Sequence, residues 1–219
     1  MKQFTGLVVS LTLPVAYALG GEAPMLKKMV DAGKLPPLEE RLPENPLVEN
    51  PVTEVGEYGG KLVLGTAFFL DDERLPSRVD RNGFFQFSYP FPAEGPIKPN
   101  LAESWNWNSD GTKLTINMRK GIKWSDGKSF TTEDVIFFMD DIVNDKDVAY
   151  IWFYESNFYD AEGNFPKITK IDDHTLEFEY DATAFLSEKK YANVVWQALP
   201  KHYFKTWHPK YNSKSSYEV

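Results

Sequence analysis

The stretch that decides the fold is residues 99–143, PNLAESWNWNSDGTKLTINMRKGIKWSDGKSFTTEDVIFFMDDIV. Trp105 and Trp107 alternate with asparagines, which is typical of a half-buried strand. The run Asn108-Ser109-Asp110-Gly111 then predicts a turn, because Asn, Asp and Gly tolerate the positive φ of tight reversals. A second strand follows, so the sequence predicts an antiparallel hairpin. The apolar face of this second strand is formed by Leu114, Ile116 and Met118.

A second reversal, Asp126-Gly127, precedes a helix that we expect to begin after Thr131. Thr131 is a cap residue, and Asp134 stands three positions on, where its carboxylate reaches back to the N–H of the cap. Such a cap contributes on the order of 1 kcal/mol. We place the Asp140-Asp141 pair on the solvent-exposed face of the helix. The opposite face is an apolar stripe with spacing i, i+3, i+4 and i+7, made of Val135, Phe138, Met139 and Ile142.

The order of these elements resembles the signature region of the extracytoplasmic solute-binding proteins of ABC importers, in the family that includes the oligopeptide-, dipeptide- and nickel-binding proteins. The pattern of that family runs L-A-E-S-W, D-G, an aliphatic strand ending in R-K-G, an aromatic residue before D-G, and T-x-E-D-V at the start of a helix. The matching elements here are Leu101 to Trp105, Asp110-Gly111, Leu114 to Gly121, Trp124 to Gly127 and Thr132 to Val135.

This resemblance implies an α+β fold, the N-terminal part of a bilobal periplasmic-binding-protein fold of type II, similar to the peptide-binding members. It also implies a mixed sheet with an inserted strand–strand–helix sub-lobe. The corresponding division of the chain is a proline-rich N-terminal segment at 19–57, a first lobe strand at 58–66, an inserted second sub-lobe at 67–164, and a truncated return to the first lobe at 165–219.

Members of the family are commonly more than twice as long as these 219 residues. We therefore expect the chain to represent a fragment, and we expect residues 19–219 by themselves to bind no ligand tightly. Two further elements are predicted, of which the hairpin matches the usual return strand of the family. Residues 168–180 predict a β-hairpin around Asp172-Asp173, and alternating aromatics at 85–91 predict a strand with one aromatic face.

Residues 1–18 are typical of a secretory signal peptide, with Lys2, an apolar run and a small-x-small cleavage site at Ala16-Tyr17-Ala18. The alternatives are a membrane anchor or a buried strand, but the run falls short of the about 20 apolar residues that span a bilayer, and Pro14 interrupts it. The chain contains no cysteine, so we expect no lipid attached to a cysteine at the cleavage site. The predicted location is the periplasm.

Composition narrows the class of function. Hydrophobic residues make up 42% and aromatic residues 15% of the chain, which excludes a disordered protein. The formal charge of −8, without a local cluster of lysine and arginine, argues against nucleic acid as a partner. The lack of cysteine excludes disulfides, thiolate zinc sites and a thiol nucleophile.

The sequence predicts no catalytic residues, no metal site and no cofactor. The acid pairs are adjacent in sequence, unlike two separated catalytic carboxylates, and the three histidines lack the i, i+4 spacing of a helical metal site. We find no G-x-S-x-G and no phosphate-binding loop. A secreted glycosidase remains an alternative, and it would need two carboxyl groups about 5 Å or about 6.5–9.5 Å apart in a cleft.

The candidate ligand-binding residues are Phe68, Phe69, Tyr150 and Trp152. Phe68 and Phe69 follow the first lobe strand, where the resemblance implies a cleft lining, although aromatics also serve ordinary cores. Tyr150 and Trp152 belong to an aromatic run on a predicted loop, and exposed aromatics of this kind often hold ligands. The alternative for this run is a hydrophobic latch onto a second lobe.

The resemblance implies a binding protein that captures oligopeptides or dipeptides outside the membrane and delivers them to the transmembrane subunits of an ABC permease. An oligosaccharide ligand is the alternative within the same family, which the six tryptophans keep open. We expect two lobes that close on the ligand, and the ligand must contact both lobes to favour the closed form. We expect a monomer when the protein is complete, with no nucleic-acid partner.

Overall fold

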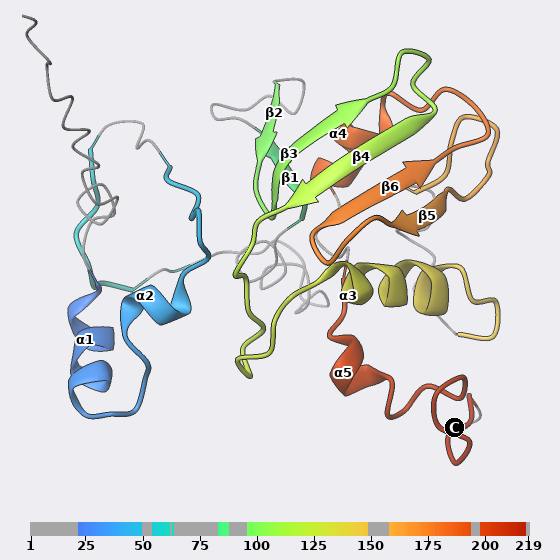
Figure 1. Cartoon of the computed structure of the whole chain (residues 1–219). Coiled ribbons are helices and arrows are strands. Elements are labelled where there is room, and N and C mark those ends of the chain that lie inside the picture. The colour runs from blue at the N-terminus through green and yellow to red at the C-terminus, as the bar shows by residue number, and fades with distance from the viewer. Residues whose placement is uncertain are drawn as a thin grey trace, which may run out of the picture. The chain divides into compact units, whose positions relative to one another are not determined.

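A computed structural model describes residues 22–49, 54–61, 63, 83–87, 96–148, 158–193 and 198–217 (Figure 1). The chain divides into two compact units, Met1–Glu40 with Val48–Lys61, and Arg41–Leu47 with Leu62–Val219. The predicted signal peptide, residues 1–18, lies outside the described residues. Within the described ranges, no helix has both the length and the apolar character needed to cross a bilayer.

The first unit contains the helix α1 (Pro24–Asp31), and the single turn α2 (Leu38–Arg41) lies where the first unit passes into the second. Proline stands at the start of α1, where its missing N–H has no helical partner to lose. Lys27 and Asp31 form an i, i+4 ion pair of 2.9 Å on the surface of α1. Neither helix buries a residue, so packing within this unit contributes little to their stability.

The lobe strand predicted at 58–66 stays a prediction, because Leu62 and residues 64–66 lie outside the described part of the chain. The side chain of Val63, which the structure describes, is exposed.

The second unit is built on a four-stranded sheet in the order β3-β4-β6-β5 (Figure 1). Its strands are β3 (Ala102–Trp107), β4 (Lys113–Met118), β5 (Lys167–Lys170) and β6 (Thr175–Glu179), and every neighbouring pair is antiparallel. A separate pair, β1 (Phe85–Phe87) and β2 (Ile97–Pro99), is also antiparallel. The α+β class is therefore confirmed, while the described strands show no parallel pairing of the kind a mixed sheet contains.

The predicted turn between β3 and β4 is confirmed. Asn108 directs its side-chain oxygen to the backbone N–H groups of Thr112 and Lys113, each at 3.0 Å. Gly111 adopts a φ of 72°, which only glycine reaches without strain. The ring of Phe185 lies directly over Gly111, because a Cβ added there would come within 2.5 Å of the Phe185 ring. Both backbone conformation and space therefore require glycine.

The predicted hairpin at 168–180 is also confirmed. Strand β6 pairs with β4 along its whole length, from Lys113 opposite Glu179 to Asn117 opposite Thr175. Residues 167–179 therefore belong to the same sheet as residues 102–118, while the expected division of the chain at residue 164 stays a prediction. β4 and β6 pair in this register because each strand buries alternate apolar side chains on the same face of the sheet.

The helix after the second reversal starts as α3 (Thr132–Ile136) and continues as a π-helix, η3 (Phe137–Val143). The capping box of Thr131 and Asp134 is present as predicted. The apolar stripe is confirmed: Val135, Phe138 and Met139 are buried, and Ile142 packs against the core.

The placement of Asp141 on the solvent-exposed face is wrong, because Asp141 is only 4% exposed. The wider π turn gives η3 a second buried face, formed by Phe137 and Asp141, and residues 208–211 contact this face. Asp140 stays exposed, as predicted.

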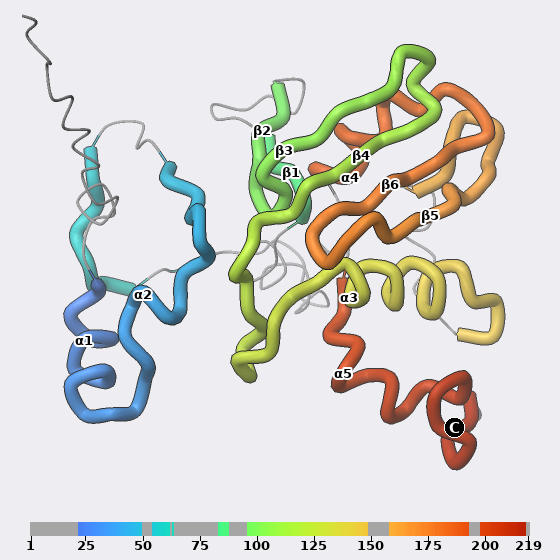
Figure 2. The backbone as a smooth tube through the Cα atoms, in the orientation of Figure 1, coloured from blue at the N-terminus to red at the C-terminus, as the bar shows by residue number. Residues whose placement is uncertain are grey.

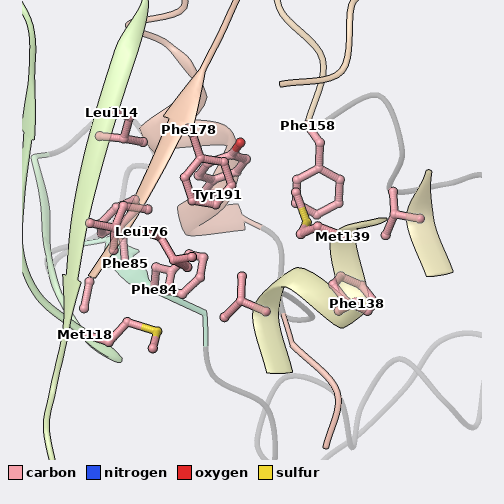
Figure 3. Packing of buried hydrophobic residues seen from close by; sticks show 14 of the residues in the cluster. Phe84, Phe85, Leu114, Met118, Phe138, Met139, Phe158, Leu176, Phe178 and Tyr191 are labelled. Carbon is pink, nitrogen blue, oxygen red and sulfur yellow. The ribbon is translucent and has the colours of Figure 1, made fainter. Parts of the chain in front are cut away.

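Figure 2 shows the path of the chain from β4 through α3 and η3 and back to the sheet as β5 and β6. The core forms between the sheet and these helices, with α4 (Ser187–Asn193) packed against β1 and β2. Figure 3 shows part of this core, in which Phe178 of β6 lies against Tyr191 of α4 with ring centroids 5.7 Å apart. The last helix is the short α5 (Lys201–Phe204).

The R-K-G end of β4 holds the proline-rich segment 41–47 against the sheet. Arg119 is buried, and its guanidinium donates to the carbonyls of Asn45 and Asn100 at 2.6 and 2.7 Å. The N–H of Glu44 donates to the carbonyl of Lys120 at 3.0 Å. Gly121 follows with a φ of 80°, and a Cβ there would lie 3.0 Å from the nitrogen of Glu44. The close approach of segment 41–47 explains why glycine follows Arg119 and Lys120.

We predict that Gly111→Ala destabilises the protein more than Gly127→Ala. Both glycines have positive φ, but a Cβ at Gly127 meets no atom within 4 Å, whereas at Gly111 it overlaps the ring of Phe185. The shared conformational strain costs about 1 kcal/mol, and the overlap adds to it at Gly111 only. The free energy of unfolding of both variants is measured by denaturation in urea. In a Phe185→Ala background the two costs should become equal, and a difference that persists there would contradict the packing explanation.

Candidate functional site

All four predicted ligand residues, Phe68, Phe69, Tyr150 and Trp152, lie outside the described residues and stay predictions. The residues that flank segment 149–157, Val148 and Phe158, both make contacts with the rest of the unit. On one side, Val148 donates its N–H to the carbonyl of Asp145 at 3.3 Å. On the other side, the ring of Phe158 is buried and lies 5.6 Å from that of Tyr191 and 6.4 Å from that of Phe138. Phe158 therefore belongs to the core of the second unit.

The buried carboxylate of Asp134 joins three segments of the second unit. One oxygen accepts the N–H of Thr131 at 2.9 Å and the indole N–H of Trp124 at 3.1 Å. The other oxygen accepts the backbone N–H of Lys201 at 2.9 Å. Because Lys201 lies 67 positions away in sequence, this side chain acts as more than a helix cap. It fixes the start of α5 to the start of α3.

Glu133 strengthens the same junction from the surface. Its carboxylate pairs with the ammonium groups of Lys201 at 2.7 Å and Lys170 at 3.1 Å. The hydrogen bond from Lys201, followed by that from Lys170, lowers the pKa of Glu133 below its ordinary value. Since its side chain is 43% exposed, solvent screening keeps the contribution of these pairs small.

A second buried carboxylate, Asp141, holds the C-terminal residues. Lys210 donates its ammonium to one oxygen, and the hydroxyl of Tyr211 donates to the other. The hydrogen bond to Asp141 raises the pKa of Lys210. Burial, and then the same carboxylate, raise the pKa of Tyr211, so this phenol remains a donor. The ring of Tyr211 also lies 5.9 Å from that of Phe137.

A third carboxylate joins the sheet to α4. One oxygen of Glu188 accepts both indole N–H groups of Trp105 and Trp107, at 2.8 and 3.1 Å. These two side chains project from the same face of β3 because they stand two residues apart. Together with Trp124, three of the six tryptophans thus direct their N–H groups to structural carboxylates.

These arrangements support the scaffold and show no catalytic geometry. The carboxylates of Asp134, Asp141 and Glu188 each accept at least two hydrogen bonds from the protein itself. In the part of the chain that the structure describes, no group of three or more His, Cys, Asp or Glu side chains is placed to hold a metal ion.

Sequence reasoning identified Asp134 as a helix cap but missed its long-range bond to Lys201, and it missed the buried role of Asp141. The available signal was the Pro200-Lys201-His202 element. Proline before Lys201 is typical of a helix start, where N–H groups are unpaired and require an acceptor elsewhere. That pattern indicates a missing acceptor but does not say which residue supplies it.

The second unit and most of the rest of the chain are similar to known proteins. The sequence model described as bacterial extracellular solute-binding proteins, family 5, middle region, matches residues 96–217. The periplasmic alpha-galactoside-binding protein of Rhizobium meliloti is 33% identical over 205 residues, which are 84% of this chain and 29% of that protein. The dipeptide-binding protein of Escherichia coli is 32% identical over 92 residues, 37% of this chain and 17% of that protein.

Two solved structures are similar over most of the chain. An oligopeptide-binding protein OppA has a TM-score of 0.73 at 34% identity and is matched over 89% of this chain and 29% of its own length. The periplasmic binding protein MelB of Agrobacterium fabrum, solved with stachyose, has a TM-score of 0.62 at 32% identity, over 88% of this chain and 31% of its own. The chain therefore spans less than a third of the length of these relatives.

We predict that Asp134→Ala lowers the free energy of unfolding by about 3 kcal/mol, because several buried donors lose their acceptor. Asp134→Asn keeps the volume but replaces an accepting oxygen with a donor, so most of the loss should remain. Asp173→Ala is the matched control, since Asp173 is exposed and pairs with Lys170 at the surface, where about 0.5 kcal/mol is typical. If Asp134→Ala and Asp173→Ala lowered the free energy of unfolding in urea by similar amounts, the central role of Asp134 would be contradicted.

The lowered pKa of Glu133 predicts a pH dependence. Its ion pairs stabilise the fold above the unfolded pKa, near 4.5, and this contribution disappears as pH falls through the lower folded pKa. Glu133→Gln should therefore cost about 0.5 kcal/mol at pH 7 and less at pH 3, as measured by urea unfolding at both values. An equal cost at both pH values would show that the side chain acts through packing instead.

Proposed function

Since the chain belongs to the bacterial extracellular solute-binding proteins of family 5, we propose that the complete protein captures a solute outside the cytoplasmic membrane and delivers it to an ABC permease. The single observation that carries this proposal is the match of residues 96–217 to the family, because those residues contain the described sheet and its helices. The structural likeness to OppA and MelB supports it.

The first candidate for the ligand is an oligopeptide or dipeptide. It is supported by the likeness to OppA over 89% of the chain and by the dipeptide-binding protein of Escherichia coli. In this proposal the described unit is a rigid part of one lobe. The carboxylates of Asp134 and Asp141 hold its segments together, so that closure of the lobes moves the unit as one body.

The second candidate is an oligosaccharide. The alpha-galactoside-binding protein of Rhizobium meliloti matches 84% of the chain, and MelB, which was solved with stachyose, matches 88%. Aromatic side chains suit sugars as well as peptides, because they offer a flat apolar face beside polar groups. Trp105, Trp107 and Trp124 support this candidate less, since their N–H groups bind structural carboxylates.

The remaining parts of the proposal concern location and partners. A periplasmic location is supported by the likeness to the periplasmic alpha-galactoside-binding protein of Rhizobium meliloti and by the signal-peptide pattern at 1–18. The proposed partners are the transmembrane subunits of an ABC permease, and the complete protein acts as a monomer without enzymatic activity. Turnover of an oligosaccharide would favour the glycosidase alternative.

Calorimetry of the complete protein tests the two ligand classes directly. We expect saturable binding either to a pool of short peptides or to stachyose and related α-galactosides, and not to both. Binding to neither pool, or hydrolysis of the sugar during the titration, would contradict the proposal.

The same titration tests the four predicted contact residues. Phe68→Ala, Phe69→Ala, Tyr150→Ala and Trp152→Ala should each weaken binding about tenfold or more, because aromatic contacts of about 1.5 kcal/mol are lost. Met25→Ala is the control, since Met25 is 72% exposed on α1. Unchanged affinity in the aromatic variants would refute these residues as contacts while leaving solute capture itself intact.

A further inference from the structure

The methionines that the structure describes fall into two classes. Met118 and Met139 belong to the core of the second unit, where they are 2% and 1% exposed. Met25 and Met29 stand on α1 in the first unit, and they are 72% and 40% exposed. The fifth methionine of the chain, Met1, lies outside the described residues. Solvent therefore reaches the thioether groups of α1 far more readily than those of the core.

The two exposed methionines share one side of α1. Met25 and Met29 are four positions apart, so their side chains lie one above the other on the helix surface. Leu26 and Val30, which are half-buried, come next around the helix and widen this apolar side. The surface ion pair of α1 lies on the opposite side, as the period of 3.6 residues requires. The outer part of the apolar side thus consists of two thioethers.

A thioether differs from the other apolar side chains of this helix because oxidants convert it to a sulfoxide. The sulfur attacks one oxygen of a peroxide, the O–O bond breaks, and that oxygen is transferred to sulfur while the other leaves as water. Sulfur loses two electrons, which the peroxide takes up. The product is polar, whereas the thioether is apolar. Access of the peroxide to sulfur is therefore what separates the two classes of methionine.

We propose that Met25 and Met29 form a reversible oxidation site for peroxides, which makes the apolar side of α1 polar and leaves the core of the second unit unmodified. The helix accepts the added oxygens because none of its residues is buried. The core methionines are enclosed by close-packed neighbours, which keep the peroxide from their sulfur atoms. This site is independent of the proposed capture of a solute.

Reversal requires a reductant of the thiol class. Two thiol groups are oxidised to a disulfide, the sulfoxide oxygen leaves as water, and the thioether is restored. Methionine sulfoxide reductases carry out this step, one enzyme for each epimer of the sulfoxide. The exposure of both α1 methionines gives such enzymes the same access that it gives the peroxide.

Peptide mass spectrometry of the 219-residue chain treated with hydrogen peroxide at neutral pH tests the site. We expect sulfoxide to form at Met25 and Met29 at least about tenfold faster than at Met118 and Met139. In urea that unfolds the chain, the four rates should converge, because the fold and not the local sequence sets the difference. The two reductases with dithiothreitol should then return both α1 sulfoxides to methionine.

The double variant Met25→Leu with Met29→Leu is the matched control, because leucine has a similar volume and helix propensity but no sulfur. Peroxide should make the wild-type chain elute earlier from a hydrophobic-interaction column and should leave the elution of the double variant unchanged. A core methionine that reacts as fast as those of α1 in the folded chain would overturn the proposal. So would a rate difference that persists in urea, sulfoxides that the reductases leave in place, or an equal shift in the double variant.

Discussion

The second unit depends on the buried carboxylate of Asp134. A carboxylate removed from water must have its oxygens bonded, and here the donors come from the helix start, from Trp124 and from Lys201. Because these donors belong to three segments, the helix cannot form its cap in the native environment without also placing the other two. The carboxylate of Asp134 that caps the helix therefore also holds together segments that are distant in sequence.

At two other places in the unit a carboxylate also accepts hydrogen bonds from segments that are distant in sequence. Asp141 ties Lys210 and Tyr211 to η3, and Glu188 ties α4 to two indoles of β3. In an acidic chain of net charge −8, these side chains act as acceptors for the protein rather than as a surface charge. Each joins segments more than sixty residues apart in sequence. The apolar core supplies most of the stability by area, and the carboxylates determine which segments meet.

This arrangement suits the proposed role in solute capture. A lobe that closes on a ligand must move as a body, because a soft lobe would absorb the free energy of the ligand contacts without transmitting motion. The sheet, α3 and the start of α5 form such a body around Asp134.

The sequence by itself determined the local elements: the turn at Gly111, the capped helix at Thr131, the hairpin around Asp172-Asp173 and the α+β class. The turn, the capped helix and the hairpin follow from φ preferences, side-chain periodicity and capping, which act over a few residues. The class follows from the family resemblance of residues 99–143. Only the tertiary structure decided that β6 pairs with β4, that Asp141 is buried and that Asp134 reaches Lys201. Strand order and the partners of buried polar groups depend on contacts between distant residues, and one sequence contains no periodic signal that specifies them. The four predicted ligand residues belong to the same class, because a cleft is formed by the meeting of segments rather than by any one of them.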